Sequence, residues 1–346
     1  MIVGYEDCSH GTEMPPRLKD VAQLAEVSVA TASRVITGSE AVRPETRARV
    51  ERAMRELLYV PPARRIGTAA IGLLVPDFAN PIFAALAHAI ERRATEAGLL
   101  SIVCSTAGSA EREADYVQML LERRVVGTIF VSSEAADLAS DHRHYQRLLE
   151  EGARLVFVNG ATEGIRAPEV RVDERVAGEL ATRHLVELGH RAVGFAAGPA
   201  HYTPTQEKEL GRTSVLIEAG LDPSGLVAHT SFTVEGGREA LRLLLARDRR
   251  PTGVICSSDL MAIGVLQEAL AQGLSVPGDL SIVGFDGIEA TRWTTPPLTT
   301  VEQPIDDIAD TAIAVLQTLV EAPERSLPSY VFRPKLRLGT STAPPR

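Results

Sequence analysis

A short polar run near the start of the chain holds side chains that suit hydrogen bonding to a nucleic acid. Arg34 carries a planar guanidinium whose paired N–H donors match the O6 and N7 acceptors of guanine. The run also has hydroxyl groups at Ser28, Thr31 and Ser33, which can donate hydrogen bonds to phosphate oxygens. Contacts to phosphate position a protein on DNA without reading its sequence. The apolar Val29 and Ala30 can contact only a thymine methyl group or the shape of the groove. Together these residues predict a DNA-contacting surface.

Two short helices joined by a tight turn would present that surface. Apolar residues recur at helical spacing on both sides of the turn, at Val21, Leu24, Ala25 and Val27 and then at Val29, Ala32, Val35 and Ile36. Ser28 stands where the second helix needs an N-cap, because its hydroxyl can accept a hydrogen bond from a backbone N–H. The pattern predicts a helix-turn-helix whose second helix enters the major groove, although a small basic bundle of helices shares the same amphipathicity.

A third helix is predicted over residues 46–58. Pro44 suits the first turn of a helix, since its fixed φ is already helical and its missing N–H has no partner to lose there. The apolar face of this helix would close a three-helix core through Val50, Met54, Leu57 and Leu58.

Charge separates this head from the rest of the chain. Residues 17–65 hold ten Lys and Arg against six Asp and Glu, whereas the 346-residue chain as a whole carries a net charge of −9. Only the head is therefore expected to meet phosphate. Cys8, Cys104 and Cys256 are isolated, which argues against a disulfide framework or a metal site and suits a reducing cytoplasm.

No apolar run approaches the length of a membrane span. Residues 1–13 lack the basic and apolar parts of a signal peptide. We interpret them as a disordered extension or as the product of an upstream start before Met14.

From residue 69 onward, apolar strands alternate with amphipathic helices. Such βα units predict parallel sheets covered by helices on both faces, and these bind ligands at the carboxyl ends of their strands. The strands are expected over 70–75, 100–104, 128–131, 154–158, 192–196, 253–256 and 281–285. The helices between them are expected over 82–97, 111–123, 176–188, 237–246 and 259–271.

The run LKDVAQLAEVSVATASRVITG, followed by VRPETRARVERAMRELLYVP, resembles the LacI/GalR family of bacterial transcription regulators. The resemblance continues through IGLLVPDFANPIF, SSDLMAIGVLQEAL and VPGDLSIVGFD to the end of the chain. It implies an N-terminal three-helix helix-turn-helix domain over 14–60, a linker over 61–68, and an α/β two-lobed periplasmic-binding-protein-like (type I) domain over 69–346. The implied N-lobe spans about 69–160 and 289–324, and the implied C-lobe spans about 161–288 and 325–346.

By the same resemblance, Val29 and Ala30 take the positions that vary with operator sequence, and Arg34 takes the base-contacting position. The implied function is that of a cytoplasmic regulator, usually a repressor. A homodimer would bind a pseudo-palindromic double-stranded operator, and a small molecule in the cleft between the lobes would change its DNA affinity. Neither a cofactor nor a metal is implied.

Candidate effector-binding residues follow from matching positions in this family. They comprise Asp77, Phe78, Asn80, Phe83, Asp173, Phe232 and Asp286. Carboxylates, amides and aromatic faces together suit a sugar or related polyol, although Phe83 could be a core residue and Asp77 a turn residue.

Three positions depart from the family pattern. Lys208 stands where the family usually has an effector-gripping arginine, Ser258 replaces an asparagine, and Asn159 replaces an aspartate. Lysine lacks the planar fork for a bidentate grip. The effector is therefore left open between an unusual sugar, a phosphorylated or acidic metabolite attracted to Lys208, and no effector.

The linker also departs from the family. It is roughly seven residues shorter than a linker that forms a minor-groove helix with a leucine wedge. Ile66 is its one large aliphatic residue, and Arg64 and Arg65 could enter a narrow minor groove or remain solvated on a simple tether. We therefore expect weaker DNA bending than is usual in the family.

Two other classes of function remain as alternatives. A solute-binding protein for a sugar transporter shares the two-lobed fold, but it would carry a secretion signal and no DNA-binding head. An enzyme is disfavoured, because no Ser-His-Asp order, phosphate loop or metal-ligand cluster stands out.

Overall fold

The computed structural model describes residues 17–36, 42–57, 59, 69–132, 134–160 and 164–346. The chain divides into two compact units, residues 1–66 and residues 67–346. The expected N-terminal extension and the linker residues Arg64, Arg65 and Ile66 lie outside the described residues.

The first unit contains the three predicted helices, α1 (Leu18–Leu24), α2 (Val29–Ile36) and α3 (Pro44–Glu56). Small and β-branched side chains fill its core, which consists of Val21, Ala22, Ala25, Ala32, Val35, Val50, Ala53 and Tyr59. Leu24, which belongs to the predicted apolar stripe, is 46% exposed and lies outside this core. Val21 and Ala22 are the buried residues of the short α1 helix, and its C-cap residue Ala25 is buried one turn after Val21.

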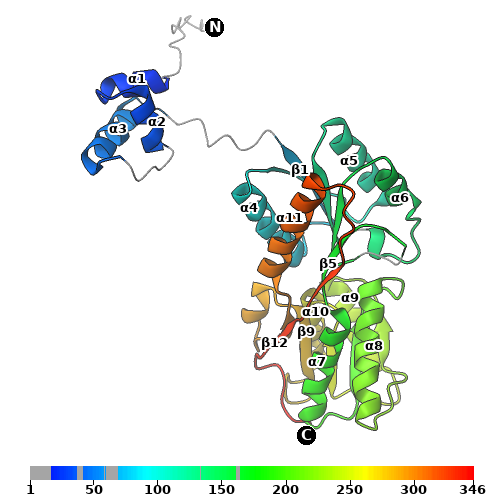
Figure 1. Cartoon of the computed structure of the whole chain (residues 1–346). Helices are drawn as coiled ribbons and strands as arrows, with labels where there is room; N and C mark the ends of the chain where they lie inside the picture. Colours follow the sequence, from blue (N-terminus) through cyan, green and yellow to red (C-terminus); the bar gives the residue numbers. More distant parts are fainter. Residues whose placement is uncertain (1–16, 37–41, 58, 60–68, 133, 161–163) are drawn as a thin grey trace, which may run out of the picture. The chain divides into compact units, whose positions relative to one another are not determined.

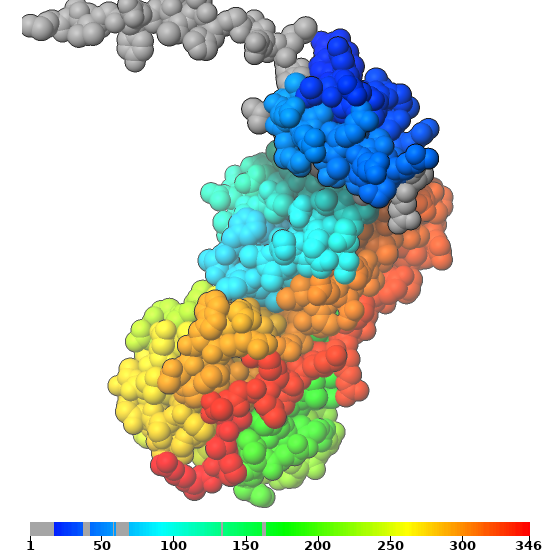
Figure 2. All heavy atoms as spheres, turned by 90° about the vertical axis from the view of Figure 1, so that its left-hand side faces the viewer, coloured from blue at the N-terminus to red at the C-terminus, as the bar shows by residue number. Residues whose placement is uncertain are grey.

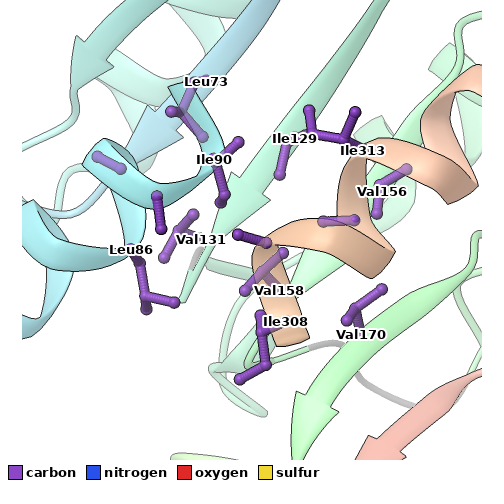
Figure 3. Close-up of a cluster of buried hydrophobic side chains, with 14 of the residues drawn as sticks. Leu73, Leu86, Ile90, Ile129, Val131, Val156, Val158, Val170, Ile308 and Ile313 are labelled. Atoms are coloured by element: carbon purple, nitrogen blue, oxygen red, sulfur yellow. The ribbon is translucent and has the colours of Figure 1, made fainter. Parts of the chain in front are cut away.

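The first lobe of the large unit is a wholly parallel sheet of six strands in the order β11-β5-β4-β3-β1-β2. The strands are β1 (Ala70–Val75), β2 (Leu100–Ser105), β3 (Gly127–Val131), β4 (Leu155–Val158), β5 (Glu169–Val172) and β11 (Tyr330–Phe332). One face is covered by α4 (Pro81–Glu96) and α11 (Ile305–Glu321), and the other by α5 (Ala110–Glu122) and α6 (Arg143–Glu150) (Figure 1). In Figure 3, Leu86 and Ile90 of α4 and Ile308 and Ile313 of α11 meet branched side chains of β1, β3, β4 and β5.

The second lobe repeats this arrangement. Its sheet order is β12-β10-β9-β8-β6-β7, and all its neighbours are parallel except β12, which runs antiparallel to β10. The strands are β6 (Val193–Ala197), β7 (Val227–His229), β8 (Gly253–Cys256), β9 (Ser281–Asp286), β10 (Thr299–Glu302) and β12 (Lys335–Arg337). The helices α7 (Glu174–Glu187) and α8 (Thr203–Glu218) cover one face, and α9 (Val234–Leu245) and α10 (Asp259–Ala271) cover the other.

Glycines allow the helices of each second-lobe pair to touch backbone to backbone. A Cβ added at Gly264 of α10 would overlap the carbonyl oxygen of Val234, and one at Gly237 of α9 would overlap that of Met261. Between α7 and α8, a Cβ at Gly178 would overlap the carbonyl oxygen of Lys208. The distance between the helices of each pair therefore depends on glycine at these contact points.

The chain crosses between the lobes three times, after β5, after β10 and between β11 and β12. These crossings lie later than the expected positions near 160, 288 and 325. The difference arises because polar or partly exposed residues interrupt the apolar pattern of β5 (EVRV), β10 (TTVE) and β11 (YVF). The equally short β4 is apolar and buried throughout, and it was predicted. The last part of the chain, red in Figure 2, runs over the surface of both lobes.

Candidate DNA-contacting helix and ligand cleft

The turn before α2 is built by local hydrogen bonds. The backbone N–H of Thr31 donates to Ser28 Oγ at 3.0 Å, which confirms Ser28 as the N-cap. The two hydroxyls of Ser28 and Thr31 are also hydrogen-bonded to each other at 2.8 Å. Glu26 adopts a φ of +50° in the turn, a left-handed conformation that reverses the chain between α1 and α2.

One side of α2 faces solvent. Ala32 and Val35 point into the head's core, while Ser28, Val29, Ala30 and Arg34 are exposed and Thr31 and Ser33 are half-buried. Val29 is 49% exposed although it is apolar, so it adds little to the core of the head. The predicted DNA-contacting residues therefore share one exposed helix face and its margin.

A residue that the sequence did not single out supports this turn. Arg49 of α3 donates from Nη2 to the carbonyl oxygen of Ala25 at 2.7 Å, and the same nitrogen lies 3.1 Å from Glu26 Oε2. The contact bridges residues 24 positions apart in the chain, so no local pattern could have revealed it.

The large unit holds a cavity of about 210 Å³ where the carboxyl ends of the two sheets face each other. Both lobes contribute to it, the first through the loops after β1, β3 and β4 and the second through those after β8 and β9. It brings together most of the predicted effector residues, namely Asp77, Asn80, Phe83, Lys208, Phe232, Ser258 and Asp286. It also includes residues that the sequence did not indicate, among them Glu134, Glu174, Tyr202 and Gln303.

Two of the predicted residues do not line this cavity. Phe78 is 53% exposed, and Asp173 caps α7 by accepting a hydrogen bond from the N–H of Val176 at 3.0 Å. Position matching within the family suggested Asp173 as a ligand contact, but the first turn of α7 takes up its carboxylate.

The first-lobe wall combines turn-forming and cavity-lining roles. Asp77 Oδ1 accepts a hydrogen bond from the N–H of Asn80 at 2.8 Å, and Asn80 Oδ1 caps α4 by accepting from Ile82 at 3.3 Å. Both side chains still line the cavity. Each side chain therefore keeps hydrogen-bonding positions that a ligand hydroxyl can use.

Aromatic rings form the opposite wall. Tyr202 and Phe232 meet edge to face, with ring centroids 5.9 Å apart. A Cβ at Gly198 would overlap the Phe232 ring, so glycine is needed for that ring to lie against the strand end. Such faces suit the C–H surface of a sugar ring.

The second lobe holds two buried carboxyl groups, Asp259 and Asp286, of which Asp286 lines the cavity. Asp259 accepts hydrogen bonds from Thr300 Oγ1 at 2.6 Å and from the N–H groups of Gly287 and Ile288 at 2.8 and 2.9 Å. Burial raises the pKa of Asp259 to about 6. Burial also raises the pKa of Asp286 well above its ordinary value, and the negative charge of Asp259 raises it further.

A hydrogen-bonded chain links the two lobes at the base of the cavity. Asn159 Nδ2 donates to Gln303 Oε1 at 2.6 Å, and Gln303 Nε2 donates to Asp286 Oδ1 at 2.8 Å. Asn159 follows β4 of the first lobe, whereas Asp286 ends β9 of the second. The asparagine that departs from the family pattern is thus the donor that begins this chain.

The variant Asn159→Asp is expected to lower the free energy of unfolding by about 1–2 kcal/mol at pH 8, because a carboxylate cannot donate to Gln303. The new carboxylate would be buried, so its pKa should be raised and the loss should shrink towards pH 5. Denaturant unfolding at both pH values measures the effect. An equal loss at both would contradict the electrostatic part of this explanation.

Within the described residues, no group of three or more His, Cys, Asp or Glu side chains is placed to hold a metal ion. No helix in the described part of the chain is long and apolar enough to cross a membrane.

Comparison with known proteins assigns each of the two units to a known type of domain. Residues 17–62 match the family described as bacterial regulatory proteins, lacI family, and residues 182–342 match a periplasmic binding protein-like domain. An uncharacterized HTH-type transcriptional regulator in the aml 5′ region of Streptomyces limosus is 41% identical over 339 residues, covering 96% of each chain.

Solved structures extend the comparison. A complex of the transcriptional regulator CelR with cellobiose is 30% identical, with a TM-score of 0.72 and coverage of 94% of this chain and 99% of that one. The lac repressor dimer bound to operator and the anti-inducer ONPF is 25% identical, with a TM-score of 0.71 and coverage of 95% and 100%. The chain belongs to the LacI family of bacterial regulatory proteins and is a DNA-binding transcriptional regulator.

Proposed function

We propose that this protein is a dimeric repressor that reads a pseudo-palindromic operator with α2 and is controlled by a sugar in the cleft. Its residues Ser28, Val29, Ala30, Thr31, Ser33 and Arg34 would contact the operator. The protein would act in the cytoplasm, where the operator is, and would carry out no catalysis. The cleft would take the sugar between the carboxyl and amide groups of one wall and the aromatic rings of the other.

The observation that carries this proposal is the gathering of Asp77, Asn80, Phe232 and Asp286, from both lobes, around one cavity. A ligand touching both lobes can favour the closed arrangement over an open one, which is how a small molecule shifts the state of a two-lobed domain. The cellobiose complex of CelR and the ribose operon repressor of Escherichia coli, 32% identical over 307 residues, favour a sugar. The operator-bound lac repressor dimer favours a dimer on DNA. The match over residues 17–62 disfavours a transporter's solute-binding protein.

The proposal is tested in two steps on the full-length protein. Selection from random double-stranded DNA should return a site with two inverted halves, and sedimentation should show two protein copies on each site. Thermal unfolding in the presence of pentoses, hexoses and disaccharides, beginning with ribose and cellobiose, should then reveal a stabilising ligand. That ligand should change operator affinity. A single asymmetric half-site, or no sugar that affects operator binding, would contradict the corresponding part of the proposal.

Arg34→Ala should weaken specific operator binding by about 1–3 kcal/mol and relax the preference at one base pair in each half-site. The matched control is Arg34→Lys, which keeps the positive charge but loses the planar fork. Lysine should restore most of the salt-dependent affinity and little of the base preference. If Arg34→Ala weakens all DNA sequences equally, Arg34 is a phosphate contact instead.

A further inference from the structure

We propose that Glu174 neutralises Lys208 and thereby makes the cleft select an uncharged sugar over its phosphorylated form. This inference rests on the proposed sugar-binding function and specifies the chemical class of the ligand. It concerns a residue, Glu174, that no sequence pattern indicated.

Lys208 and Glu174 form a buried ion pair on the wall of the cavity. The ammonium Nζ of Lys208 contacts Glu174 Oε2, and the two side chains are only 5% and 8% exposed. The same nitrogen lies 3.8 Å from the centroid of the Phe285 ring. Lys208 is thus held by a carboxylate and an aromatic face and does not extend towards a ligand as a free charge.

The helix pairing holds these two residues in register. Glu174 is the first residue of α7, and Lys208 lies in the second turn of α8. At Gly178 the backbone of α7 contacts the carbonyl of Lys208 itself, and at Gly211 the backbone of α8 contacts that of Arg175. Because the two backbones touch at these points, the spacing of the helices is fixed and the side chains of Glu174 and Lys208 stay within reach of each other.

The lining of the cavity holds more acidic than basic side chains. Among the described residues that line it, Lys208 is the one Lys or Arg, whereas Asp77, Glu134, Glu174 and Asp286 carry carboxyl groups. A phosphate entering this cavity would lose its water and find the ammonium already engaged by Glu174. A neutral sugar avoids this cost, and its hydroxyls can donate to the carboxylate oxygens.

The first experiment compares matched probes on the wild-type protein by isothermal titration calorimetry. The pairs are cellobiose with cellobiose 6′-phosphate and ribose with ribose 5-phosphate. We expect at least one neutral sugar to bind and its phosphorylated partner to bind at least tenfold more weakly. A phosphorylated probe that binds as tightly as its neutral partner would overturn this inference and leave the proposed function standing. If neither neutral probe binds, the pair becomes the sugar that the thermal-unfolding screen identifies and its phosphate ester, and a screen that identifies no sugar would overturn both.

The second experiment assigns the selectivity to Glu174. In Glu174→Gln the ammonium of Lys208 loses its partner, so the ratio of phosphorylated to neutral dissociation constants should fall on the order of tenfold. Glu134→Gln is the matched control. It removes the same charge from the lining, but Glu134 accepts a hydrogen bond from Ser140 and leaves the ion pair intact. In Glu134→Gln, the logarithm of the ratio of phosphorylated to neutral dissociation constants should fall by less than half of its fall in Glu174→Gln.

Equal ratios in the two variants would overturn the role of Glu174. The double variant Glu174→Gln/Lys208→Met removes both charges and should again reject the phosphorylated probe, whereas acceptance of that probe would count against the inference. Thermal unfolding in circular dichroism confirms that each variant is folded. If Glu174→Gln alone does not fold, the four-probe comparison on the wild-type protein still tests the selectivity itself.

Discussion

Replacing Lys208 by methionine should lower the free energy of unfolding of the large unit by about 3–5 kcal/mol at pH 8. The variant leaves Glu174 buried without its counter-charge. Burial raises the pKa of Glu174 even with Lys208 present, and the ammonium opposes that rise. Without the ammonium, the glutamate can remain in the folded protein only by taking up a proton.

Protonation of Glu174 makes the stability of Lys208→Met depend on pH. A carboxyl group whose pKa is higher in the folded state than in the unfolded state binds more protons when folded. The stability that it contributes is complete below its unfolded pKa and is lost as the pH rises through the folded value. Lys208→Met should therefore cost least near pH 4–5 and most near pH 8.

Calorimetric or denaturant unfolding of the full-length protein across this pH range measures the effect. The double variant Lys208→Met/Glu174→Gln is the control, because it removes the unpaired charge and should recover most of the loss at pH 8. A penalty that stays constant from pH 5 to pH 8, or a double variant as unstable as the single one, would mean that lost packing and not an unpaired charge causes the instability.

Gly264→Ala should destabilise the large unit by about 2–3 kcal/mol, contrary to the usual effect of this substitution in a helix. Alanine normally stabilises a helix interior by about 1 kcal/mol relative to glycine. Here the added methyl group would overlap the carbonyl oxygen of Val234, so α9 and α10 must separate.

The same variant should weaken sugar binding. Phe232 lies just before α9 and Ser258 just before α10, and both line the cavity. Separation of the helices would move these side chains relative to each other. Calorimetric unfolding and sugar titration measure the two effects, and Gln267→Ala at an exposed position of α10 provides the control, with little change expected in either. A Gly264→Ala protein more stable than the wild type would refute the predicted overlap.

Long periodic segments could be predicted from the sequence. The helix-turn-helix, the strands β1, β3 and β8 and the helix α10 appear within about one residue of their expected positions, because each has a strong apolar pattern or a cap at its start. The helices α8 and α11 were not among the predicted helices. The strands β5 and β7 were missed because short strands gain their stability from sheet neighbours rather than from local pattern.

The cavity could be predicted only in part. Matching positions in the family indicated residues such as Asp77 and Asp286, and they lie at or just after strand ends, where parallel sheets place ligands. The electrostatic state of Lys208 could not be predicted, because its partner Glu174 lies 34 positions away on another helix. The sequence therefore left a phosphorylated effector open, and the ion pair disfavours it.

The threefold passage of the chain between the lobes has a consequence during synthesis. The head can fold once its residues through Tyr59 have been made, but the first-lobe sheet lacks β11 until residue 332 is added. At common translation rates that strand follows its neighbour β5 by roughly 10–30 s. During this interval β5 has an open edge, which invites pairing with another nascent chain. Truncation before residue 330 should therefore leave a folded DNA-binding head attached to an aggregation-prone remainder.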